Sequence, residues 1–193
     1  METILTSRSL NVMFDDYSTR VLGDYVSALP REKGKMRKYA VIAPLPTKEE
    51  YLVLKKNKYK TTVGDLISGA VGDLEYLKDE LQEWFDNLPE NFQQGDKGSQ
   101  LEEAISNLEY ISELDIPDEI SSTETVHYPA LKTSSRADRR DEAISMLETA
   151  KEVIEDMTDF EEGSTDKSEL DEIHSSIEEI IDNAQNVEFP SMF

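Results

Sequence analysis

Residues 63–88 carry an apolar side chain every three or four positions, and this spacing constrains the fold more than any other feature of the chain. Side chains three and four residues apart share one face of an α-helix, so the spacing predicts a helix that packs along its whole length. Thr62, with Asp65 three residues later, is expected to cap its N-terminus, and Pro89 is expected to end it. The apolar stripe comprises Val63, Ile67, Ala70, Val71, Leu74, Leu77, Leu81, Trp84 and Leu88.

Three further stripes with the same spacing predict three more helices. They follow a glycine-containing loop at 90–98, and they are separated by an aperiodic, Ser/Thr/Pro-rich stretch at 117–135 and by a turn at 161–164. The pattern therefore predicts two αα-hairpins, at 61–116 and 136–193, joined by a linker at 117–135 and assembled as a helical bundle or coiled coil. The three stripes are Leu101, Ala104, Ile105, Leu108, Ile111 and Leu114; Ala143, Leu147, Ala150, Ile154 and Met157; and Leu170, Ile173, Ile177, Ile180, Ile181, Ala184 and Val187.

Residues 1–60 have a mixed pattern and predict a small N-terminal α+β head. Apolar residues at 12–29 predict one amphipathic helix ended by Pro30. Residues 39–43 predict a short strand, and residues 51–54 fit either a second strand or a short helix. Any sheet is expected here, so the fold class is mainly α with a small α+β head.

Charge is divided very unevenly between the head and the rest of the chain. The net charge is −22, yet residues 1–60 hold 12 basic and 7 acidic groups, a net charge of +5. Residues 61–193 hold 8 basic and 35 acidic groups, a net charge of −27. Such an acidic segment repels nucleic acid and anionic membranes and attracts basic surfaces, although it also fits a merely solvated helical surface.

Several kinds of chemistry lack the residues that they need. The chain has no cysteine, and its two histidines, His127 and His174, have no second histidine at ligand spacing. Glu80, Glu83 and Asp86 share a helix face, as in the magnesium sites of all-α nucleotide pyrophosphatases, but a second acidic motif is only loosely matched at 179–182. We therefore expect no enzyme activity, no cofactor and no metal.

Membrane insertion and secretion are not expected either. The chain has no apolar run of about 18 residues, and residues 1–5 lack the pattern of a signal peptide. The expected location is the cytoplasm of the cell that makes or hosts the protein.

The segment from Glu80 to Gln93, with Leu101–Ala104, is the least ordinary part of the sequence. It reads ELQEWFDNLPENFQ and then LEEA. This segment resembles one found in uncharacterised small acidic helical proteins of bacteriophages and prophages. The resemblance covers residues 80–104 and implies a phage origin, but no activity.

These features together favour a protein that binds other macromolecules. Carboxylates at three-to-four spacing can present charge in rows, as duplex phosphates do, so the leading hypothesis is a phage-encoded inhibitor or adaptor that mimics DNA on a basic surface of a host protein. The alternative is an assembly component that oligomerises through its helical seams, and a homo-oligomer is expected in either case. The residues expected to contact the partner are Glu80, Glu83, Trp84, Phe85, Asp86, Glu148, Glu152 and Glu155.

The basic head has two interpretations. Tyr39, Tyr51 and Tyr59 lie among lysines and could stack on bases, but the acidic segment opposes direct nucleic-acid binding. Docking of the head on an acidic surface, of its own chain or of a second subunit, is the simpler expectation.

Overall fold

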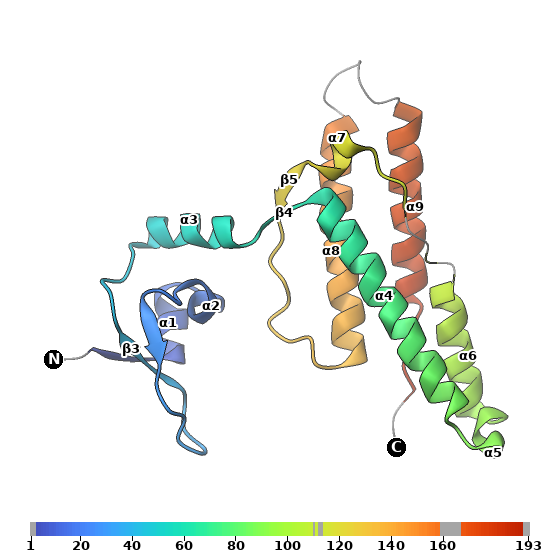
Figure 1. Ribbon diagram of the computed structural model, residues 1–193, viewed down its shortest axis with the longest axis horizontal. Coiled ribbons are helices and arrows are strands. Elements are labelled where there is room, and N and C mark those ends of the chain that lie inside the picture. The colour runs from blue at the N-terminus through green and yellow to red at the C-terminus, as the bar shows by residue number, and fades with distance from the viewer. Residues whose placement is uncertain (1–2, 110, 112–113, 159–166, 191–193) are drawn as a thin grey trace. The chain divides into compact units, whose positions relative to one another are not determined.

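The computed structural model describes residues 3–109, 111, 114–158 and 167–190. The chain divides into two compact units, Met1–Lys60 and Thr61–Phe193. The boundary falls where the sequence changes from basic to acidic. The structure is mainly helical with little sheet, as the sequence predicted (Figure 1).

The first unit packs short helices against a three-stranded antiparallel sheet. Strand β3 lies between β1 and β2, with Leu5 opposite Tyr39 and Ala28 opposite Tyr39 on the other side. Leu10, Leu22 and Tyr51 are almost fully buried in its core. The elements are β1 (Ile4–Thr6), α1 (Ser7–Met13), α2 (Ser18–Val21), β2 (Val26–Ala28), β3 (Lys38–Val41) and α3 (Lys48–Lys58).

The prediction of one continuous helix over residues 12–29 is wrong. The helix breaks at Asp15, whose carboxylate accepts hydrogen bonds from the backbone N–H of Tyr17 at 2.8 Å, from Lys55 at 2.7 Å and from the Tyr51 hydroxyl. A local side-chain-to-backbone bond of this kind competes with helix formation. Burial alone would raise the pKa of Asp15, but these hydrogen bonds outweigh it and leave the pKa lowered.

Residues 51–54 belong to helix α3, which settles the choice between strand and helix. Thr47 caps this helix with a full capping box, in which Glu50 N–H donates to Thr47 Oγ1 at 3.2 Å and Thr47 N–H donates to Glu50 at 2.7 Å. This pair satisfies two otherwise unpaired donors at the helix start. The expected strand at 39–43 is confirmed as β3.

The second unit is built on four long helices that share one apolar core (Figure 1). Helix α8 packs against both α4 and α9, and α6 packs against α4 and α9. Residues 61–116 and 136–193, for which two hairpins were predicted, therefore belong to one packed unit. The helices are α4 (Val63–Asp86), α5 (Glu90–Gln93), α6 (Asp96–Glu109), α7 (Asp118–Ser121), α8 (Arg136–Thr158) and α9 (Lys167–Gln185).

Helix α4 confirms its predicted start and shows why its first turns are rich in glycine. Thr62 caps it by accepting a hydrogen bond from Asp65 N–H at 3.1 Å. A Cβ at Gly64 would lie 2.0 Å from the Ser121 hydroxyl oxygen. A Cβ at Gly69 would lie 2.8 Å from the terminal carbon of Met146. These glycines let α7 and α8 approach α4 closely.

The stretch 117–135 is more ordered than its composition indicated. It contains α7 and strand β5 (Glu124–Val126), which pairs with β4 (Lys60–Thr62) in a second sheet. The expectation that any sheet lies within the head is therefore wrong. The predicted turn at 161–164 lies outside the residues that the structure describes.

Candidate functional site

Exposed carboxylates gather on the outer side of helices α8 and α9, and we call this surface the acidic face. It consists of Glu148, Glu152 and Glu155 on α8 and of Asp171, Glu178 and Asp182 on α9, all exposed. Steps of three, four or seven residues place each set along one side of its helix. Because α8 packs against α9, the two rows run beside each other.

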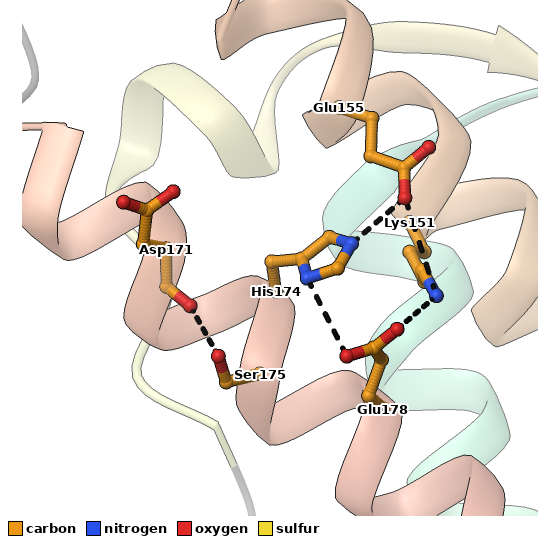
Figure 2. Close-up of polar contacts among 6 residues, drawn as sticks. All are labelled: Lys151, Glu155, Asp171, His174, Ser175 and Glu178. Atoms are coloured by element: carbon orange, nitrogen blue, oxygen red, sulfur yellow. Dashed lines mark hydrogen bonds and ion pairs between the residues drawn. The ribbon is translucent and has the colours of Figure 1, made fainter.

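Two side chains, Lys151 and His174, cross-link the rows (Figure 2). Lys151 Nζ donates to Glu178 Oε1 at 2.6 Å and lies 4.0 Å from Glu155 Oε1. His174 Nε2 lies 2.8 Å from Glu155 Oε1, and its Nδ1 lies 3.9 Å from Glu178 Oε2. Lys151 and His174 are each 24% exposed, whereas the two glutamates are 54% and 51% exposed. The carboxylates therefore face the solvent above their nitrogen partners.

The electrostatics of the cross-link follow from the Lys151–Glu178 hydrogen bond. It is the main cause that raises the pKa of Lys151 above its ordinary value. The same bond lowers the pKa of Glu178. Both groups are thus held in their charged forms at neutral pH.

Three arginines at the start of α8 form hydrogen bonds and ion pairs with other residues of the second unit. Arg136 Nε and Arg139 Nη2 donate to the two oxygens of Glu80, at 2.8 and 2.5 Å. Arg140 donates to the Val187 carbonyl at 2.6 Å and pairs with Asp141. Positive charge at a helix N-terminus is unfavourable on its own, so these partners compensate for its position.

The predicted partner residues on α4 have several different surroundings. Glu80 is half-buried, and its pKa is lowered mainly by the hydrogen bond from Arg139. Trp84 and Phe85 are half-buried against the core, and the Arg136 guanidinium lies 4.7 Å from the centre of the Trp84 ring. Glu83 and Asp86 are exposed.

The structure separates the predicted residues into two groups. The α4 group lies beside the start of α8, because Glu80 binds Arg136 and Arg139. Glu148 is nine residues beyond Arg139, which is about 13 Å along a helix. Asp171, Glu178 and Asp182 were not among the predicted residues, although their spacing along one side of a predicted helix is visible in the sequence.

His127, placed by the sequence in a linker, belongs to a buried polar network. Its Nε2 lies 3.0 Å from Glu142 Oε1 and its Nδ1 lies 3.1 Å from Thr149 Oγ1. The second oxygen of Glu142 accepts a hydrogen bond from the Ala130 N–H at 2.6 Å. The His127 and Glu142 side chains are only 8% and 11% exposed, so the network fastens residues 127–130 to α8 and is closed to a substrate.

The acid clusters do not assemble a metal centre in the part of the chain that the structure describes. Among those residues, no three His, Asp or Glu side chains are grouped so that they could hold an ion. Within the same ranges, no helix combines the length and the apolar character needed to cross a membrane.

Comparisons of this chain with protein-family models, with curated proteins and with solved structures found no match. The resemblance of residues 80–104 to phage proteins therefore stays a prediction.

Proposed function

We propose that this chain is a non-enzymatic inhibitor or adaptor that binds the basic, nucleic-acid-binding surface of another protein as a DNA mimic. The observation that carries the proposal is the acidic face, where two rows of exposed carboxylates lie above Lys151 and His174. Carboxylates arranged in rows along packed helices can attract a basic protein surface in the way that the phosphates of duplex DNA do.

The distribution of cations supports this use of the face. Among the residues that the structure describes, four basic residues of the second unit form ion pairs with carboxylates of that unit, namely Arg136, Arg139, Arg140 and Lys151. Their side chains are 21 to 27% exposed. These four cations are therefore largely shielded from solvent, whereas Glu148, Glu152 and Asp171 of the acidic face are exposed.

The alternative, an assembly component that oligomerises through the helical seams, has less support. The seam residues of α4 and α8, such as Leu74, Leu77 and Leu147, are 0% exposed within the single chain. A homo-oligomer was predicted because the apolar stripes were expected to be too long for one chain to cover. The single chain buries these residues itself, so the stripes give no reason to expect a second subunit. The oligomeric state itself stays a prediction.

A phage origin fits the proposal, since a phage inhibitor of host or anti-phage defence proteins acts in the host cytoplasm on proteins that handle nucleic acid. The partner is then a host or phage protein with a basic surface. The segment at 80–104 supports this origin by its resemblance alone.

One experiment can both identify the partner and test whether the acidic face binds it. The immobilised chain is mixed with the heparin-retained protein fraction of a bacterial lysate, and bound proteins are eluted with duplex DNA. Reversal of Glu148, Glu152 and Asp171 to lysine should abolish DNA-elutable capture. The matched control reverses Glu102, Glu103 and Glu109, which are exposed on α6 and change the net charge equally. Equal loss in both variants would reduce the proposal to a general charge effect and contradict it.

A further inference from the structure

The exposed residues 31–38, which we call the basic loop, lie between strands β2 and β3 of the first unit and include Lys38, the first residue of β3. Its sequence is REKGKMRK, with five cations and one carboxylate, so it holds +4 of the unit's net charge of +5. Every one of its residues is exposed. Five of the twelve cations of the head therefore lie at one end of a hairpin.

The backbone of the hairpin holds this loop in place. Leu29 N–H donates to the Lys38 carbonyl at 2.9 Å and closes the base of the loop. Lys35 N–H donates to the Glu32 carbonyl at 3.0 Å, in a turn where Gly34 adopts a φ of 77°. A positive φ is readily adopted by glycine, so the turn is specified by the sequence.

Most of the loop's charge is available to a ligand. Lys35 pairs with Glu32. Among the described residues, no carboxylate pairs with Arg31, Lys33, Arg37 or Lys38. These four cations contrast with the four of the second unit that are held in ion pairs.

We propose that the basic loop binds the phosphate backbone of nucleic acid without reading its sequence. Duplex DNA carries one charge per about 1.7 Å of its axis, so its phosphates form a dense anionic target. Four cations within eight residues of an exposed loop can contact several of these phosphates at once.

The tyrosines that suggested base stacking do not take part. Tyr39 is 9% exposed and Tyr51 is 1% exposed, and both belong to the core of the first unit. Tyr59 is half-buried against that core, with its ring 5.4 Å from the Tyr17 ring in an edge-on contact. Without stacking, binding depends on phosphate contacts alone. The affinity should then depend steeply on salt and little on base composition.

The acidic second unit does not prevent this contact. The −27 charge of residues 61–193 is the reason to expect that the chain repels nucleic acid. At physiological ionic strength the Debye length is about 8 Å, so repulsion acts only on phosphates that come close to the acidic helices. The proposal is independent of the DNA-mimic function, because it concerns a different unit and a different ligand.

The test measures fluorescence anisotropy of a labelled 20-base-pair duplex with the full chain from 25 to 200 mM salt. Four phosphate contacts give a slope of log affinity against log salt no steeper than about −3.6, at about 0.9 per contact. Changing Arg31, Lys33 and Arg37 to glutamine should weaken binding by at least about tenfold and flatten the slope by up to about 2.7. The matched control changes Arg8, Lys48 and Lys56, which are exposed cations of the same unit, and should keep the wild-type slope.

Three results would overturn the proposal. One is no binding of the wild-type chain at 25 mM salt, and another is equal weakening in the two triple variants. The third comes from sedimentation of the same samples: if the loop variant alters self-association and leaves DNA binding unchanged, the loop is a protein-binding element. Thermal unfolding of each variant, followed by circular dichroism, identifies any variant that fails to fold.

Discussion

His174 Nε2 lies 2.8 Å from Glu155 Oε1, and this contact joins helix α9 to helix α8 within the acidic face. Lys151 makes the second cross-link, to Glu178 at 2.6 Å. Both nitrogen-bearing side chains are less exposed than the carboxylates that they hold. The face thus presents anions outward while its own cations stabilise their positions.

Replacing Lys151 with methionine should restore the pKa of Glu178 toward its ordinary value of 4.5, because the hydrogen bond from Lys151 is the main cause of its lowering. NMR titration of the side-chain carboxyl carbons measures this directly. The stability of the fold should change little, since this ion pair lies near the surface and is screened by solvent. An unchanged Glu178 titration would show that the cross-link does not form in solution.

Replacing Glu80 with glutamine should destabilise the second unit by about 1–2 kcal/mol, because two half-buried guanidiniums lose their carboxylate. The folded-state pKa of Glu80 is lowered from 4.5. The contribution of Glu80 to the free energy of unfolding is therefore complete above its unfolded-state pKa, and it disappears as the pH falls through its folded-state pKa. Urea unfolding at several pH values measures the difference.

The control for Glu80 is Glu83→Gln on the exposed side of the same helix, expected to change stability by less than about 0.5 kcal/mol. A Glu80 effect that persisted unchanged at acidic pH would argue against an ionic origin.

Replacing Glu142 with alanine should cost about 1–3 kcal/mol, because His127 and the Ala130 N–H lose a buried partner. Hydrogen exchange should show faster exchange of the Ala130 amide than in the wild-type chain. Glu152→Ala, at an exposed position on the same helix, serves as the control. Undiminished protection of Ala130 would contradict the role of Glu142 in fastening residues 127–130.

The sequence predicted the helices whose apolar stripes are local and long. Leu74, Leu147 and Ile177 each lie in a predicted stripe and are 0% exposed. A stripe specifies its own helix by spacing alone, so no knowledge of its neighbours was needed.

Other parts of the fold depend on contacts between residues far apart in the sequence. Asp15, at the break between α1 and α2, is also bonded by Tyr51 and Lys55, which are 36 and 40 residues away. Strand β4 requires β5, more than sixty residues later. Neither partner is visible in a local pattern.

The candidate site was only half predicted for a similar reason. Glu148, Glu152 and Glu155 stood out as a row on one helix, but their pairing with Asp171, Glu178 and Asp182 depends on how α8 packs against α9. Glu80 was grouped with exposed acids, because its arginine partners lie 56 and 59 residues away.

The most direct test of the DNA-mimic proposal is the salt dependence of complex formation with the protein captured from the heparin-retained fraction. Biolayer interferometry from 50 to 200 mM salt, with and without competing duplex DNA, measures it. We expect fast association, at least a tenfold loss of affinity across this range, full competition by DNA, and less than a twofold effect of Glu152→Gln alone. An affinity that is independent of salt and unaffected by DNA would contradict the proposal.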